Sequence, residues 1–192
     1  MKSKIALFFL AACLVGPVVA AKKTPELTPW TREPDSFMGV RFEKKLEYSL
    51  PACPKTYEAR GEMCRDEPYQ TYYRIQHGPE IGVGYQLGIM ASNSVIDSFY
   101  LTTNPDRFED LVTIFIKKYG EPSQRIPQTV KTKGGAEFKD ELLLWKGRAV
   151  TIVIKKYDGD INTTSASLQS NASTEREAQE KNSGAASGAS KL

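Results

Sequence analysis

The sequence predicts an α+β fold, in which an antiparallel sheet with a C-terminal β-meander packs against one main α-helix and one disulfide bond closes a loop. Three observations lead to this prediction. Residues 104–119, "NPDRFEDLVTIFIKKY", have the apolar period of a single amphipathic helix. Strand-like segments joined by short turns follow that helix. The N-terminus has the pattern of an export signal, and export favours pairing of the two cysteines that lie beyond it.

Residues 1–21 have the order of a secretory signal peptide. Lys2 and Lys4 precede an apolar run, and the small residues that end at Ala21 suit cleavage. The run is too short to span a bilayer, so we expect no transmembrane segment. A lipid anchor at Cys13, which follows "LAA", is the alternative to ordinary cleavage. The signal and its bacterial type of cleavage site predict a location in the periplasm.

Cleavage of the signal leaves two cysteines, Cys53 and Cys64, with ten residues between them. An even pair in an exported chain predicts a disulfide bond. A reactive thiol or metal pair is the alternative, but this spacing is far from that of a CxxC motif. The mature chain has 24 basic residues, because two of the 26 lie in the signal, against 23 acidic ones. Such a near-neutral chain lacks the basic surface of nucleic-acid-binding proteins, so we expect no nucleic-acid partner.

Composition divides the remaining chain into three parts. Residues 22–36 are polar, contain three prolines and predict an extended leader. Residues 37–169 carry the apolar patterns and form the α+β domain. Residues 170–192 are rich in Ser, Ala and Gly without apolar period, which predicts a disordered tail. A capping box at Thr174 and Glu177 allows one or two helical turns within that tail.

The elements before the main helix are predicted from alternating apolar residues and from turn-forming residues. They are a short strand at 37–42, a helical turn at 43–54, and strands at 71–77, 81–90 and 94–103.

The main helix has clear start and stop signals. Asn104 is a good N-cap, and Pro105 stands at the first helical position, where its missing N–H is tolerated. Gly120 ends the helix, and Pro122 prevents its continuation. One apolar stripe, which needs a sheet as its partner surface, is formed by Phe108, Leu111, Val112, Phe115, Ile116 and Tyr119.

Strands at 141–145, 149–157 and 161–169 are predicted after the helix, joined by turns at Lys146-Gly147-Arg148 and Asp158-Gly159. An earlier strand at 124–132 contains Pro127, which favours an edge position. In the strand at 149–157, the side chains that share one face and are expected to meet the helix are Val150, Ile152 and Ile154.

Catalytic and metal-binding motifs are weak in this chain. The glycines at 82, 84 and 88 are spaced one residue too widely for a dinucleotide fingerprint and favour a loosened strand. His77, the only histidine, has no G-x-S-x-G partner and is interpreted as a turn residue. Asp158, Asp160 and Asn162 begin like a calcium loop, but Thr163 and Gln169 break the pattern. We therefore expect no cofactor, no metal and no catalytic residue.

The acidic residues leave one enzymatic hypothesis open, because paired carboxylates of glycosidases meet in space rather than in sequence. Most of these acids lie in polar runs and are expected at the surface: Glu58, Glu62, Asp66, Glu67, Glu109, Asp110, Asp140 and Glu141.

A binding site is suggested by the segment "YQTYYRI" at 69–75, just after the predicted disulfide loop. Tyrosine and arginine are frequent anchors of protein interfaces. On a strand, Tyr72 and Arg74 share one face while Tyr73 and Ile75 share the other, which favours the core. Tyr69, Tyr72 and Arg74 are therefore the candidate binding residues.

The layout of one helix and a meander, with "KYGEPS" at the helix end, is similar in outline to small bacterial envelope modules, such as outer-membrane assembly lipoproteins and β-lactamase-inhibitor-like domains. The resemblance covers a few residues and assigns no functional residue.

The leading hypothesis is a small periplasmic binding protein without catalytic activity, whose partner is a protein or another envelope macromolecule. Three alternatives remain: an inhibitor or immunity protein against a periplasmic hydrolase or toxin, a carboxylate-dependent cell-wall hydrolase, and a structural subunit of an envelope or secretion assembly.

Overall fold

The computed structural model describes residues 30–56 and 61–191. The predicted signal, Cys13 and the first part of the predicted leader lie outside the described residues. The predicted α+β class is confirmed: within the described residues, eight antiparallel strands form one sheet, accompanied by several helices and the disulfide between Cys53 and Cys64. From edge to edge, the order in the sheet is β3 (Cys64–Arg65), β4 (Tyr72–Gln76), β5 (Gln86–Ser92), β6 (Val95–Thr103), β10 (Thr164–Ser170), β9 (Val150–Lys155), β8 (Glu137–Lys146) and β7 (Gln124–Lys131).

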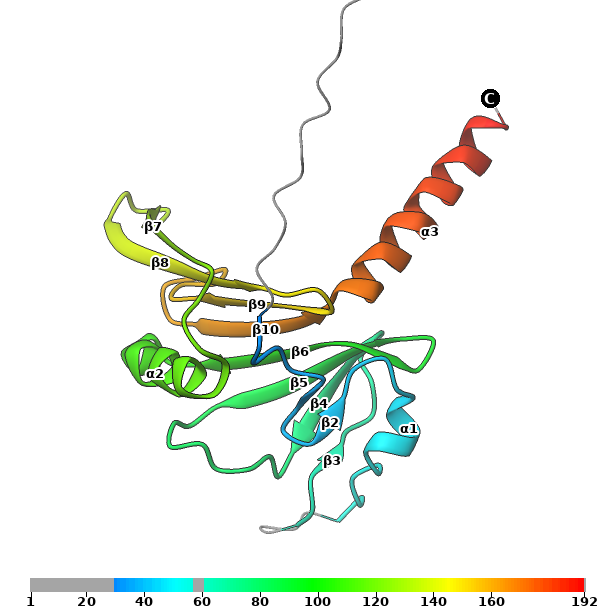
Figure 1. The fold of residues 1–192 in the computed structure, drawn as a ribbon, viewed down its shortest axis with the longest axis horizontal. Helices are drawn as coiled ribbons and strands as arrows, with labels where there is room; N and C mark the ends of the chain where they lie inside the picture. Colours follow the sequence, from blue (N-terminus) through cyan, green and yellow to red (C-terminus); the bar gives the residue numbers. More distant parts are fainter. Residues whose placement is uncertain (1–29, 57–60, 192) are drawn as a thin grey trace, which may run out of the picture.

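The sheet consists of two meanders, β3 to β6 and β7 to β10, which lie one above the other in Figure 1. They are joined edge to edge because the last strand of each pairs with the other, for example Ala166 opposite Leu101. The connection between the meanders is η1 (Pro105–Arg107) followed by α2 (Phe108–Tyr119). Two predicted strands begin later than expected, because their first residues, 81–85 and 161–163, lie in loops.

Helix α2 begins and ends where the sequence predicts, with one difference. The Asn104 side chain accepts a hydrogen bond from the Asp106 N–H at 2.9 Å, but the first turn is a 3₁₀ turn. At the other end, Gly120 adopts φ 85°, a left-handed conformation that glycine reaches without strain. The apolar stripe is buried, and Phe115 is 2 % exposed in one core with Ile152 and Ile154 of β9.

The C-terminal end of α2 is fixed by indole groups from two distant segments. Trp30 donates to the Tyr119 carbonyl at 2.6 Å, and Trp145 of β8 donates to the Gly120 carbonyl at 2.8 Å. The last carbonyls of a helix have no partners inside it, so these bonds satisfy groups that would otherwise need water. Glu33 also accepts hydrogen bonds from the backbone N–H groups of Ala149 and Val150. The described part of the predicted leader is thus bonded to the domain.

A short hairpin and a short helix before the main sheet contribute residues to the hydrophobic core. β1 (Ser36–Phe37) and β2 (Val40–Arg41) form a hairpin where the sequence predicts one short strand. The hairpin turn uses Met38 and Gly39, both with positive φ. The predicted helical turn is α1 (Leu46–Ser49), whose Leu46 is 2 % exposed and joins the core.

The segment after β10 differs from the predicted disorder. α3 (Asn171–Ala189) is a helix. Its N-cap is Ser170, whose side chain accepts a hydrogen bond from the Ser173 N–H, and this cap stands in place of the predicted capping box. Its first two turns are anchored by side chains on the domain, which a composition argument does not detect. Beyond Arg176 every described residue of α3 is exposed, and Figure 1 shows the helix projecting away from the sheet.

β7 is an edge strand, as Pro127 predicts. The Thr132 N–H bonds the Ala136 carbonyl at 2.9 Å, in the same register that pairs Lys131 with Glu137. Because backbone groups alternate in direction along a strand, the nitrogens of Arg125, Pro127 and Thr129 face the open edge. The proline therefore stands where it removes one donor from that edge.

Candidate binding surface

The predicted division of side chains on β4 is confirmed. Ile75 is 6 % exposed in the core, and Tyr73 packs partly buried against it. Tyr72 and Arg74 lie on the opposite face, here called the outer face, across from Met90 and Gly88 of β5. Tyr72 and Arg74 therefore face away from the hydrophobic core.

The end of β4 forms an aromatic corner, defined by Tyr69, Tyr72, Met90 and Arg74. Tyr69 and Tyr72 exchange backbone hydrogen bonds at 2.9 and 3.0 Å, so both rings leave one tight turn. The ring of Tyr72 lies over Gly88, where any Cβ would overlap its atoms. Tyr69 is 76 % exposed and Met90 is 37 % exposed. The three candidate binding residues thus lie at one corner of the sheet. Met90 lies beside them, and no pattern in the sequence predicts it as a binding residue.

A hollow of about 390 Å³, here called the disulfide hollow, lies beside the predicted bridge. Cys53 and Cys64 are bonded, which confirms the predicted disulfide. The Cys53 N–H also donates a hydrogen bond to the Arg65 carbonyl at 2.9 Å. Cys53 is therefore joined to β3 both by the disulfide and by this hydrogen bond. The lining of this hollow consists of Cys53, Pro54, Lys55, Thr56, Asp66, Arg74, Gln76 and His77.

A second hollow of about 480 Å³ lies inside the loop from β4 to β5. The Tyr85 hydroxyl donates to the Pro79 carbonyl at 2.6 Å and lies so close to Gly78 that a Cβ there would collide with it. His77 has φ 55°, a left-handed conformation that is uncommon outside glycine. It lines both hollows, at a turn position as the sequence predicts.

Tyr100, Lys155 and Asp158 form a polar cluster elsewhere on the outer face. Tyr100 donates to Asp158 at 2.7 Å, and Lys155 donates to the other carboxylate oxygen at 2.9 Å. Burial and the hydrogen bond to Asp158 raise the pKa of Tyr100 to about 12. Burial raises the pKa of Asp158, but hydrogen bonds from Tyr100 and Lys155 outweigh it and lower the pKa overall. Near neutral pH the phenol is protonated and the carboxylate is charged, as expected for a structural contact.

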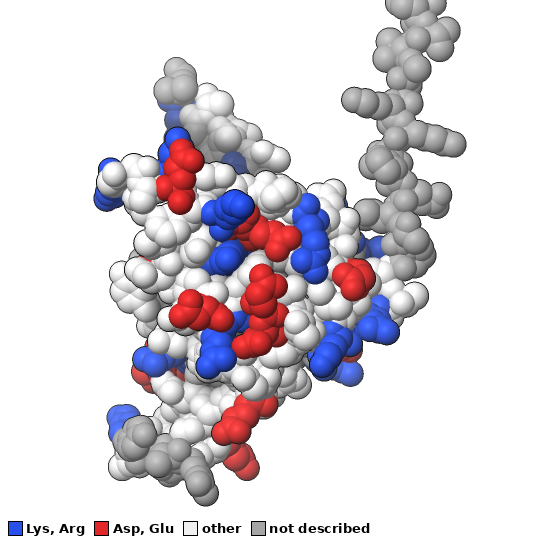
Figure 2. Space-filling model, turned by 90° about the vertical axis from the view of Figure 1, so that its left-hand side faces the viewer, with Lys and Arg blue, Asp and Glu red and all other residues white. Residues whose placement is uncertain are grey.

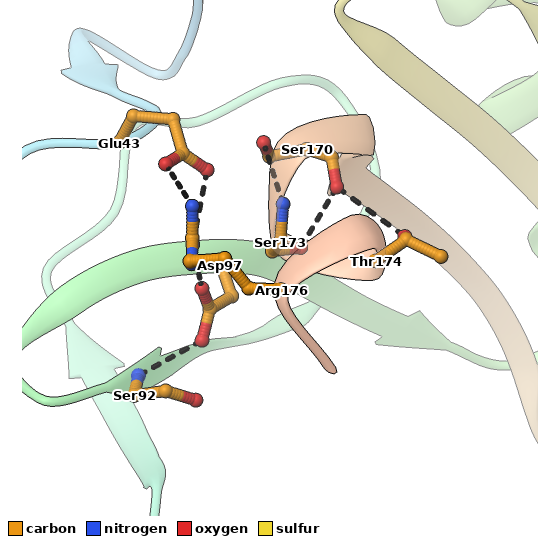
Figure 3. A network of polar contacts seen from close by, with 7 residues as sticks. All are labelled: Glu43, Ser92, Asp97, Ser170, Ser173, Thr174 and Arg176. Atoms are coloured by element: carbon orange, nitrogen blue, oxygen red, sulfur yellow. Dashed lines mark hydrogen bonds and ion pairs between the residues drawn. The ribbon is translucent and has the colours of Figure 1, made fainter. Parts of the chain in front are cut away.

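A second network attaches α3 to the domain (Figure 3). Arg176 donates to Asp97 at 2.6 Å and to Glu43 at 2.5 Å. Asp97 is 5 % exposed and also accepts the Ser92 N–H at 2.8 Å. Burial raises the pKa of Glu43, but hydrogen bonds from Arg176 and Ser170 lower it overall. Two carboxylates therefore meet in space, as the glycosidase hypothesis requires, but an arginine lies between them.

One of the predicted surface carboxylates, that of Asp140, is buried and has a structural role. Asp140 is 4 % exposed, against the predicted surface position. Its carboxylate accepts hydrogen bonds from the Gln128 side chain and from the N–H groups of Glu141 and Tyr157. Asp140 thereby ties the β7–β8 hairpin to the segment after β9, which explains its burial.

Other features of the described residues give no further site. In residues 30–56 and 61–191, no three His, Cys, Asp or Glu side chains form a group that could hold a metal ion. Among the helices within those ranges, none is both long and apolar enough for a membrane span. On the face shown in Figure 2, acidic and basic side chains are interspersed. Comparison of the chain with protein-family models, curated proteins and solved structures finds no match.

Proposed function

We propose that the chain is a periplasmic binding protein without a catalytic role, and that it recognises a protein or another envelope macromolecule through the aromatic corner. The observation that carries this proposal is the position of Tyr69, 76 % exposed on a turn bonded to β4. An exposed tyrosine on rigid backbone supplies a large contact area at a small loss of side-chain entropy.

The aromatic corner has the composition of an interface centre. Tyrosine, methionine and arginine are enriched in such centres, whereas lysine and glutamate are depleted. The adjoining outer face of β5, β6 and β10 supports this reading, because its register positions hold no charged side chain. They are Gln86, Gly88, Met90, Ser98, Tyr100, Thr102, Ser165, Ser167 and Gln169.

Site-specific photo-cross-linking tests the proposal. A photoreactive amino acid replaces Tyr69 in the full chain, which is expressed in the cells that normally make it. A matched probe replaces Arg148, an exposed residue in the turn between β8 and β9. We expect a discrete cross-linked product from position 69 but not from position 148.

The variants Tyr69→Ala and Arg74→Gln serve as competitors in the same experiment. Purified wild-type chain should suppress the cross-link, and the double variant should fail to do so while keeping the wild-type thermal midpoint. The same product from both probe positions, or equal suppression by both competitors, would contradict a role of the aromatic corner.

A further inference from the structure

We infer that the disulfide hollow is an anion-binding subsite, which takes a carboxylate or phosphate group of the partner. This inference rests on the proposed function, since it adds the chemistry of the ligand to the aromatic corner. Arg74 belongs to both features, because it is part of the corner and also lines the hollow.

The lining of the hollow holds more basic than acidic side chains. Lys55 and Arg74 line it together with a single carboxylate, that of Asp66, and His77 adds an imidazole. Asp66 already accepts a hydrogen bond from the Gln76 side chain at 2.8 Å. None of the ion pairs formed among the described residues involves Lys55 or Arg74. Two cations therefore share a concave surface with the Asp66 carboxylate, and neither cation forms an ion pair within residues 30–56 and 61–191.

The backbone is held in place on two opposite sides of the hollow. The disulfide joins Cys53 to Cys64, and Arg65 donates its N–H to the Pro51 carbonyl at 2.9 Å. On the opposite side, Arg74 is held in the β4–β5 ladder. His77 keeps a left-handed backbone conformation, which surrounding structure must stabilise in a residue other than glycine. A ligand would therefore meet side chains that stand on backbone already fixed by these contacts, which reduces the entropy that the backbone loses on binding.

The residue types define the class of ligand. A guanidinium offers paired N–H donors that match two oxygens of a carboxylate or phosphate. A lysine ammonium adds charge, and an imidazole N–H adds a third type of donor. The aromatic corner lies next to these donors, so an anionic group at one end of a partner can be held while the rest contacts Tyr69 and Tyr72.

Titration with small anions tests the subsite on the full mature chain. Inorganic phosphate and acetate are added at constant ionic strength, and backbone amide shifts are followed by NMR. We expect saturable shifts at Lys55, Asp66 and the segment 74–77. Arg74→Gln should weaken binding by about tenfold or more, because hydrogen bonds to charged groups are among the stronger ones. Arg148→Gln, the same change at an exposed turn, should alter it by less than about twofold.

Two further variants separate loss of the donor from loss of the fold. Lys55→Gln changes an exposed side chain outside the sheet and should weaken binding as well. His77→Asn keeps a residue type that tolerates left-handed backbone and replaces the imidazole by a shorter amide. Tighter binding of phosphate than of acetate would indicate a phosphorylated partner, and tighter binding of acetate would indicate a carboxylate-bearing one.

The inference is wrong if the shifts spread without saturation over all exposed cations, or if Arg74→Gln and Arg148→Gln behave alike. That result together with a persistent cross-link at Tyr69 would leave the proposed function standing without this subsite. Conversely, saturable phosphate binding without any cross-link would support the subsite and contradict the proposed function.

Discussion

Replacing Arg176 by methionine removes the cation that joins α3 to the domain and leaves the stem of the side chain nearly intact. The Asp97 side chain is 6 % exposed, the Arg176 side chain 40 % and the Glu43 side chain 35 %. The variant thus leaves a buried carboxylate whose remaining partner is the Ser92 N–H, and a half-exposed carboxylate that water can reach.

The expected loss of stability follows from these exposures. Removal of one partner from a fully buried ion pair costs about 3–5 kcal/mol, and an exposed pair contributes about 0–1 kcal/mol. Since one member of the Asp97 pair is buried and the other is partly exposed, we expect a loss of about 2–3 kcal/mol. Adding Asp97→Asn removes the uncompensated charge and should recover about 1 kcal/mol of that loss, a coupling that a double-mutant cycle measures.

Urea unfolding monitored by tryptophan fluorescence gives the free energies, because Trp30 and Trp145 both bond the end of α2. Arg107→Met is the matched control, since its ion pair with Asp110 at 3.3 Å has side chains 60 % and 57 % exposed. The control should change stability by less than about 0.5 kcal/mol. An Arg176→Met midpoint that equals the control midpoint, at the same denaturant slope, would refute the assignment of Arg176 as an anchor.

Three further outcomes are expected. The mature chain should titrate with no free thiol, and replacing Cys53 and Cys64 by serine should lower the free energy of unfolding by about 3 kcal/mol, because the bridge restricts the unfolded chain; unchanged stability would contradict this reading. Burial raises the pKa of Tyr100 and Tyr119 to about 12 from 10.0. The neutral phenols therefore contribute stability that is fully present below pH 10 and is lost as the pH rises through 12. Tyrosinate absorbance should show these two tyrosines ionising at higher pH than exposed tyrosines, and Tyr100→Phe should remove one of the two late ionisations. Finally, Pro127→Thr restores an N–H at the open edge of β7 and should increase self-association in sedimentation, whereas a variant as monomeric as wild type would show that the proline does not protect the edge.

The parts of the fold that the sequence predicts well are those specified by local signals. Asn104, Pro105 and Gly120 fix the ends of the main helix within one turn, because caps depend on neighbouring residues alone. Pro127 identifies an edge strand for an equally local reason, since it lacks a donor. The disulfide follows from cysteine number once the signal is set aside.

The parts that the sequence does not predict depend on distant pairs. The pairing of β6 with β10 places Leu101 opposite Ala166, and no local pattern specifies that register. α3 is a similar case. Its own composition indicates disorder, whereas its start is fixed by Arg176 contacting Glu43, more than a hundred residues earlier. Only a tertiary contact can supply this anchor, so propensity gives the wrong answer.

The candidate site shows the same division between local and distant information. Alternation along β4 predicts that Tyr72 and Arg74 face away from the core, and this is confirmed. The disulfide hollow, in contrast, brings Lys55 to Arg74 through the bridge and the β3–β4 pairing. A lysine in a polar run has no pattern that marks it as part of a site. The local signals around His77 predict a turn residue, and they do not show that it lines a hollow.

The position of the disulfide gives a reason to expect rigidity at the proposed subsite. β3 has only two residues, and its pairing with β4 has only two register positions, so it is the weakest edge of the sheet. Cys64 lies on that short strand and is 3 % exposed. A bridge at this point stabilises the edge on which the aromatic corner and the hollow both depend. Reduction should therefore weaken phosphate binding even under conditions in which the core of α2 and β8 to β10 remains folded. Faster hydrogen exchange that is confined to residues 51–56 and 61–76 would show that only this edge has opened.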